Sequence, residues 1–89
     1  MFHVAFTETA DKQFSKLDKF TQRQLAKFII NENLENTENP RRLGKALKGD
    51  FKGLWRYDIG KYRFICSIED KILRILAVKV GHRREVYRT

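Results

Sequence analysis

Residues 45–63 read KALKGDFKGLWRYDIGKYR, and this stretch decides the fold. Its first half is basic and punctuated by glycines, which predicts a loop. Apolar and polar residues alternate in its second half, as is typical of a half-buried β-strand. The alternation directs Arg56 and Asp58 to one face of that strand and Trp55 and Tyr57 to the other. We therefore expect Trp55 and Tyr57 to be core residues.

A short turn at Gly60-Lys61 follows the strand, and Tyr62-Arg63 begins the next one. Arg56 and Arg63 are therefore expected near each other on neighbouring strands. Guanidinium groups that are fixed on a rigid sheet lose little side-chain entropy when they bind a phosphate chain. The strand pair accordingly predicts a phosphate-binding surface.

Two short helices are predicted upstream, after a first strand at residues 2–6. Thr7 is placed to cap the first helix and Asp18 the second, which is expected to run to about Leu34. The side chains expected to face the core are Ala10, Phe14 and Leu17 on the first helix and Leu25, Phe28 and Ile29 on the second, with Phe20 near its start. Two consecutive short helices form an antiparallel hairpin.

Three strands are predicted downstream, at about residues 54–59, 62–69 and 72–80. The last is apolar on both faces for most of its length, which marks an interior strand. The order β-α-α-β-β-β predicts an α+β fold, in which the helical hairpin packs on one face of a mostly antiparallel four-stranded sheet. The other face is expected to be partly open.

Composition bounds the class of protein. A length of 89 residues predicts a single domain, residues 1–89, with one modest core. No run approaches 18 apolar residues and the N-terminus does not resemble a signal peptide, so we expect a cytoplasmic protein without a membrane partner. Cys66 is the single cysteine, which excludes an internal disulfide. No Cys/His spacing or nucleotide-binding loop is present, so no metal and no cofactor are expected.

The net charge of +8 is unevenly placed. Residues 1–40 hold five lysines and arginines against six acids, whereas residues 41–89 hold fourteen against five. The basic excess falls on the half of the chain that carries most of the sheet. Such polarity favours a polyanionic partner, and nucleic acid is the usual one.

Taken together, the order of elements and three motifs resemble the RelE/ParE family of bacterial toxin–antitoxin toxins, across almost the whole chain. The motifs are the loop LKGDFKG at residues 47–53, the strand pair LWR with GKYR at 54–56 and 60–63, and the ending GHRREVY at 81–87. The family contains both ribonucleases and gyrase poisons, so the resemblance implies the fold more firmly than the activity.

The resemblance to the RelE branch implies a toxin that enters the ribosomal A site and cuts mRNA. It implies catalytic positions at Arg56, Arg63, Arg83 and Tyr87. RelE-type strands usually carry a second basic residue two positions after the first, where this chain has Asp58. The resemblance further implies a cognate antitoxin that covers the basic sheet face.

Metal-free RNA cleavage needs a base for the 2′-OH, stabilisation of the pentacovalent phosphate, and an acid for the 5′-oxygen. Arg56 and Arg63 suit the second task, because guanidinium groups stay charged and donate a fork of N–H groups. Arg83 is suited to stabilise negative charge on the leaving 5′-oxygen. His82 is the natural proton carrier, because its unperturbed pKa lies near neutrality. Asp58 is either a base or the salt-bridge partner of an arginine.

The tail is expected to bend at Gly81 and to bring Tyr87 back over the two arginines, where it would stack on a base or orient the 2′-OH. The exposed lysines Lys45, Lys48 and Lys52 are expected to contact RNA backbone without sequence preference. Two other functions stay open. One is a ParE-like toxin that binds DNA gyrase, and the other is a basic RNA-binding module without toxicity.

Overall fold

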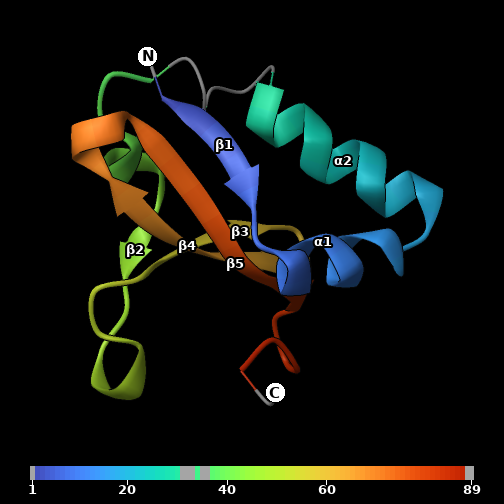
Figure 1. Cartoon of the computed structure of the whole chain (residues 1–89). Helices are drawn as coiled ribbons and strands as arrows, with labels where there is room; N and C mark the ends of the chain where they lie inside the picture. Colours follow the sequence, from blue (N-terminus) through green and yellow to red (C-terminus); the bar gives the residue numbers. More distant parts are fainter. Residues whose placement is uncertain (1, 31–33, 35–36, 88–89) are drawn as a thin grey trace.

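The computed structural model describes residues 2–30, 34 and 37–87, and in it two helices cover one face of a five-stranded sheet (Figure 1). The chain enters through a strand and the helical hairpin, and then builds the rest of the sheet. The elements are β1 (His3–Phe6), α1 (Glu8–Ser15), α2 (Lys19–Ile30), β2 (Lys45–Ala46), β3 (Trp55–Ile59), β4 (Tyr62–Glu69) and β5 (Arg74–His82).

The strands lie in the order β1-β5-β4-β3-β2. β1 runs parallel to β5, and the other neighbours are antiparallel. The predicted α+β class and the interior position of the last strand are confirmed. β5 begins at Arg74, slightly later than predicted, because a 3-10 turn at Asp70–Ile72 and the left-handed Leu73 (φ 51°) complete the turn from β4.

The prediction of four strands was wrong by one, because β2 lies within the stretch that was predicted to be a loop. Its two residues, Lys45–Ala46, pair with Arg56 and Trp55 of β3. A strand this short has no alternation to detect. A glycine permits the pairing: a Cβ on Gly44 would lie 2.8 Å from the Arg56 carbonyl oxygen and 2.9 Å from the Tyr57 ring.

Both predicted helix caps are confirmed. The hydroxyl of Thr7 accepts a hydrogen bond from the Ala10 N–H at 3.1 Å, and the carboxylate of Asp18 accepts one from the Thr21 N–H at 3.0 Å. Leu34 lies in a turn rather than in α2, and the rest of the predicted helix extension, residues 31–33, lies outside the described residues.

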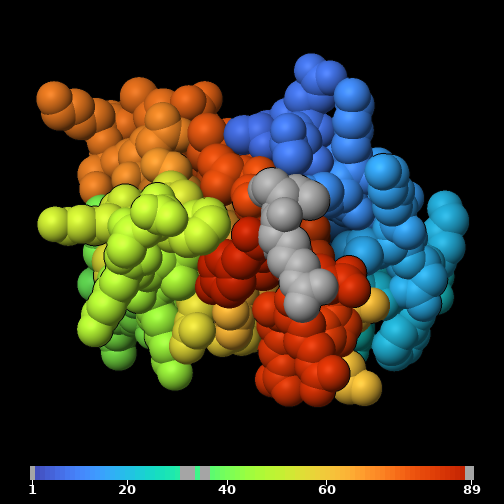
Figure 2. All heavy atoms as spheres, turned by 90° about the horizontal axis from the view of Figure 1, so that it is seen from below, coloured from blue at the N-terminus to red at the C-terminus, as the bar shows by residue number. Residues whose placement is uncertain are grey.

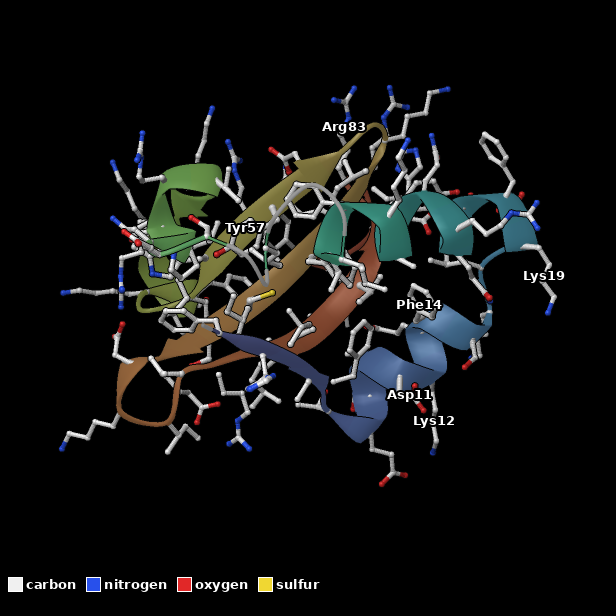
Figure 3. All side chains as sticks on the ribbon, turned by 90° about the horizontal axis from the view of Figure 1, so that it is seen from above. Asp11, Lys12, Phe14, Lys19, Tyr57 and Arg83 are labelled. Carbon is white, nitrogen blue, oxygen red and sulfur yellow. The ribbon has the colours of Figure 1, made fainter. Side chains whose placement is uncertain are left out.

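The core lies between the helices and one face of the sheet. Tyr57 is fully buried there, and its hydroxyl donates to the Pro40 carbonyl at 2.9 Å, beside the segment that follows α2 (Figure 3). Burial raises the pKa of the Cys66 thiol to about 12, which makes it inert at neutral pH. Phe20 does not join the core as expected, because its side chain is 62% exposed. The buried cluster is Phe2, Ala10, Leu25, Leu34, Tyr57, Phe64, Cys66, Ile75, Ala77 and Val80.

Within the described part of the chain, no helix is long and apolar enough to cross a membrane. The sheet face opposite the helices is left to a loop and to the C-terminal segment. Figure 1 shows both leaving the sheet on the side away from α1 and α2.

Candidate functional site

The register of β3 and β4 gathers charged side chains on the sheet face that the helices leave uncovered. Asp58 pairs with Arg63, and Arg56 pairs with Ile65. Cross-strand partners point to the same face, and residues two apart on one strand share it as well. Arg56, Asp58 and Arg63 therefore lie together, opposite the face on which Tyr57 is buried. We call this surface the open face.

Asp58 holds the two arginines together. Its Oδ1 accepts a hydrogen bond from Nε of Arg63, and its Oδ2 lies 3.6 Å from Nε of Arg56. This geometry matches the salt-bridge role predicted for Asp58. Asp58 is 40% exposed, so solvent reaches it.

Arg63 is the more enclosed arginine, with a side chain that is only 12% exposed. Its Nη1 donates to the hydroxyl of Tyr87 at 2.9 Å, while its Nε is bound to Asp58. Burial lowers the pKa of Arg63, but the hydrogen bonds to Asp58 and Tyr87 outweigh it and leave the pKa above its ordinary value. Arg63 therefore keeps its charge at any pH relevant to RNA.

Arg56 retains an unused donor. Its Nε is buried and, within the described residues, has no hydrogen-bond partner, because Asp58 Oδ2 at 3.6 Å is too distant to accept one. Buried polar atoms are nearly always satisfied, so an orphaned guanidinium N–H calls for an explanation. A phosphate oxygen that entered between Arg56 and Arg63 would supply the missing acceptor.

The C-terminal segment turns back onto the open face. The N–H groups of Glu85 and Val86 both donate to the His82 carbonyl, at 2.8 and 3.0 Å, and Val86 is buried. The Arg63 guanidinium carbon lies 5.5 Å from the centre of the Tyr87 ring. Tyr87 thus reaches Arg63 as predicted, although Gly81 is not among the glycines with positive φ and the bend follows His82 instead.

Sequence reasoning missed Phe51. It ends the 3-10 turn Gly49–Phe51 within the basic loop, and its ring centre lies 5.2 Å from that of Tyr87. The ammonium of Lys79 lies 5.5 Å from the centre of the same ring. A lone aromatic residue among charged and glycine neighbours was the available signal, because such a side chain needs an apolar partner to stay ordered.

The structure does not bring His82 to this face. His82 pairs with Tyr62 in the register, and their rings lie 5.7 Å apart. Tyr62 packs against the core on the helix side, so the His82 ring lies on that side too. Strand alternation gives the open face to Gly81, the partner of Arg63, so His82, the expected proton carrier, does not lie beside the two arginines.

The hydrogen bonding of His82 also limits its chemistry. Nδ1 accepts from the Arg84 backbone N–H at 3.2 Å. A neutral imidazole that accepts at Nδ1 carries its proton on Nε2. In this arrangement, neither ring nitrogen has a free lone pair with which to act as a base.

Arg83 lies at the end of the sheet, beside the turn between β3 and β4 (Figure 3). Its backbone N–H donates to the Lys61 carbonyl at 2.9 Å, and its side chain is exposed. Lys61, His82, Arg83 and Arg84 line a small hollow of about 170 Å³ there. The sequence-predicted residues thus form two groups: Arg56, Arg63 and Tyr87 on the open face, and His82 and Arg83 at the sheet end.

The three candidate RNA-binding lysines are all exposed on the segment that borders the open face. Lys45 pairs with Arg56 across β2 and β3 and so shares its face. Lys48 and Lys52 flank the 3-10 turn Gly49–Phe51. Figure 2 shows this segment (yellow-green, at the left) and the C-terminal segment (red, toward the centre and bottom) on the same side of the molecule.

Comparison with known proteins identifies the family. A family model described as the ParE toxin of type II toxin–antitoxin systems, parDE, matches residues 4–87. The chain belongs to this toxin family. Toxin RelE of Mycobacterium tuberculosis is 32% identical over 87 residues, which cover 98% of this chain and 87% of that protein. Toxin RelG of the same organism is 28% identical, with coverage of 98% and 97%.

A solved structure gives the same result. The crystal structure of the RelBE2 toxin–antitoxin complex from Mycobacterium tuberculosis matches with a TM-score of 0.81 and 28% identity, over 92% of this chain and 91% of that one. The relatives place the chain in the RelE-type branch of the family, as the motifs predicted. In this RelE-type toxin, the Asp58 carboxylate stands between Arg56 and Arg63.

Proposed function

We propose that this toxin is a ribosome-dependent mRNA endonuclease that acts in the cytoplasm, cleaving mRNA in the A site and so inhibiting translation. The observation that carries the proposal is the convergence of Arg56, Arg63 and Tyr87 on the open face, with a buried Arg56 N–H that lacks an acceptor. Membership of the RelE-type branch supports the same activity.

In the proposed reaction, the 2′-oxygen attacks the adjacent phosphorus and the bond from phosphorus to the 5′-oxygen breaks. The 2′-OH loses a proton and the 5′-oxygen gains one, which leaves a 2′,3′-cyclic phosphate and a 5′-hydroxyl. Arg56 and Arg63 stabilise the extra negative charge of the pentacovalent phosphate, and charge-assisted hydrogen bonds are the strongest way to do so. Tyr87 stacks on a base or orients the 2′-OH.

Asp58 and His82 are the two candidates for the proton transfers. Asp58 lies on the same face as the arginines and is acceptor-only when ionised, which suits a base. His82 lies on the helix side with Nδ1 engaged by Arg84, so it serves only if the tail rearranges on the ribosome. Arg83, exposed at the sheet end, is available to the leaving oxygen or to a neighbouring phosphate. Lys45, Lys48 and Lys52 hold the RNA backbone.

We also propose a cognate antitoxin as the neutralising partner. The related RelBE2 protein was solved as a toxin–antitoxin complex. An acidic segment that lies across the open face would pair with its arginines and lysines and would block access to Tyr87. The basic balance of residues 41–89 suits such a partner.

The alternative is a ParE-like toxin that binds DNA gyrase and does not cut RNA. The family model carries the ParE name, whereas the curated relatives carry RelE-type names. A gyrase-binding toxin does not need residues that hold a phosphate group. The presence of Arg56 and Arg63 beside Tyr87 therefore favours the ribonuclease. Asp58 is the feature that speaks for the alternative.

Induction of the toxin in cells, followed by mapping of mRNA 5′ ends, tests the proposal. We expect new 5′ ends clustered within translated codons, and cleavage of mRNA on programmed ribosomes by the purified protein. The Arg63→Ala protein is the matched control and should produce neither. Intact mRNA together with cleaved chromosomal DNA would contradict the proposal and support gyrase as the target.

A further inference from the structure

We propose that Phe51 is a positioning residue that sets the Tyr87 ring over the phosphate site, and that Lys79 fixes Phe51 in turn. This inference rests on the proposed ribonuclease function. Neither the motifs nor the family relationship assigns a role to Phe51 or Lys79. The proposal follows from contacts that join three distant segments: the loop at Phe51, β5 at Lys79 and the tail at Tyr87.

The Tyr87 side chain needs a second support. Its hydroxyl accepts one hydrogen bond from Arg63, whose guanidinium carbon also lies 5.5 Å from the ring centre, and both contacts come from the same partner. The Phe51 ring meets the Tyr87 ring at 5.2 Å between centres with an angle of 58° between planes. An aromatic contact at the ring body and a hydrogen bond at its tip together define one orientation.

Lys79 explains how an exposed loop holds an aromatic ring in place. Its ammonium lies 5.5 Å from the Phe51 ring centre, a distance at which cations and rings attract. Lys79 stands on the interior strand β5, where it pairs in the register with Ile65 of β4. Ile65 is itself fully buried although it lies on the open face. The Phe51 contact therefore rests on a rigid part of the sheet.

The same geometry separates a positioning role from direct base stacking by Phe51. The Lys79 ammonium lies over the Phe51 ring, and the Tyr87 ring packs beside it. A base that stacked on Phe51 would compete with these two contacts. Phe51 therefore acts on RNA through Tyr87.

A double-mutant cycle of Phe51→Ala and Tyr87→Ala tests this inference by the steady-state kinetics of mRNA cleavage on programmed ribosomes. We expect Phe51→Ala to lower kcat by roughly three- to ten-fold, the scale of one aromatic contact, with little change in KM. In the Tyr87→Ala background, Phe51→Ala should cause no further loss. Losses that multiply would overturn the inference, because Phe51 would then act independently of Tyr87.

Matched variants separate positioning from folding. Phe20→Ala removes the same side chain from an exposed site on α2 and should leave kcat unchanged. Phe51→Leu keeps an apolar side chain in the loop but removes the ring. It replaces Phe51→Ala in the double-mutant cycle if the alanine variant fails to fold. Phe51→Trp keeps a ring for Tyr87 and should restore most of the rate. Equal rates for the Leu and Trp variants would contradict a ring-specific role.

A spectroscopic readout keeps this inference distinct from the ribonuclease proposal. The ring signals of Tyr87 in the NMR spectrum of the free protein should move on Phe51→Ala and stay in place on Phe20→Ala. Unmoved Tyr87 signals would overturn the positioning role even if cleavage fell. A protein that shows the expected signal changes but never cuts mRNA would instead contradict the proposed function alone.

Discussion

The two faces of the same sheet have opposite chemistry. On the helix side, Tyr57, Phe64 and Cys66 are fully enclosed, and the buried Tyr57 hydroxyl is satisfied by the Pro40 carbonyl. On the open face, Arg56 and Arg63 share one carboxylate and a buried N–H lacks an acceptor. Among the residues that the structure describes, the buried side-chain donor without an acceptor lies on the open face, where a ligand could satisfy it.

Strand alternation explains how one short segment serves both faces. In β3, the core residue Tyr57 lies between Arg56 and Asp58, whose side chains point to the open face. A slip of one residue in register would exchange the two sets, and the buried apolar face prevents that slip. The core thus fixes the geometry of the arginines without touching a substrate.

The largest expected effect comes from removing Arg63, one of the two arginines that we propose hold the phosphate on the open face. Arg63→Ala should lower mRNA cleavage on programmed ribosomes by about 10²-fold or more, the scale of losing a preorganised donor to a developing charge. Because Arg63 is enclosed and bonded to Asp58 and Tyr87, the free energy of unfolding should also fall, by about 1 kcal/mol. Chemical denaturation measures that second effect.

Arg74→Ala is the control for this substitution. Arg74 also forms a strand-to-strand ion pair, with Glu69 at the opposite end of β4 and β5, at 2.7 Å. It should leave cleavage unchanged. Full activity in Arg63→Ala would remove Arg63 from the site, and equal losses in the two variants would assign the effect to charge in general.

Tyr57→Phe should break the helix side and spare the open face. The change leaves the buried Pro40 carbonyl without its donor at 2.9 Å, which costs about 1–3 kcal/mol of unfolding free energy. The rate of cleavage per folded molecule should stay the same, as measured at a temperature well below the melting transition. A loss of cleavage without a loss of stability would mean that the two faces are not separate in function.

The comparison also explains what could be predicted from the sequence. The helix side follows from alternation and helical periodicity, because burial repeats with the geometry of each element. These patterns located Tyr57 in the core and the two helix caps at Thr7 and Asp18. They also set Arg56 and Arg63 on one face, since both lie on regular strands in an antiparallel pair.

The missed features depend on irregular backbone. β2 is two residues long, and Phe51 lies in a turn, so neither has a period to detect. The face of His82 depends on the pairing of β4 with β5, which shifts by a β-bulge between Ile65 and Cys66. Local patterns carry no information about such a shift, because it is set by contacts between distant segments.

Asp58→Asn should remove the negative charge that holds Arg56 and Arg63, and so leave both arginines available to bind phosphate. If Asp58 is only the partner of Arg63, affinity for single-stranded RNA should rise by about two- to five-fold, the scale of a partly exposed ion pair. The slope of log affinity against log salt should steepen by up to about 0.7, equivalent to one more phosphate contact. Filter binding over a range of salt concentrations measures both quantities.

The same variant decides between the two roles of Asp58. If its carboxylate is the general base, cleavage on the ribosome should fall at every salt concentration even though RNA binding tightens. If it is only a partner, cleavage should hold or rise. A flat salt response in the wild-type protein would contradict the electrostatic basis of both outcomes.

The smallest expected effect concerns ion pairs that lie away from Arg56, Asp58 and Arg63. Hydrogen bonds from Arg41 to Asp70 and from Arg74 to Glu69 lower the pKa of each carboxyl. The folded protein therefore binds these protons less readily than the unfolded chain does. The resulting stabilisation is fully present at neutral pH, and it is lost below about pH 4 as acid protonates the folded carboxylates.

Asp70→Asn tests the size of this effect by removing the charge that pairs with Arg41. The Asp70 side chain is 58% exposed, so solvent screening keeps the contribution small. We expect the urea midpoints of the wild-type and variant proteins to differ slightly at pH 7 and the difference to shrink as the pH is lowered below about 4. A difference that does not shrink would mean that Asp70 stabilises the turn through its backbone geometry rather than through its charge. The cleavage rate should be the same in both proteins.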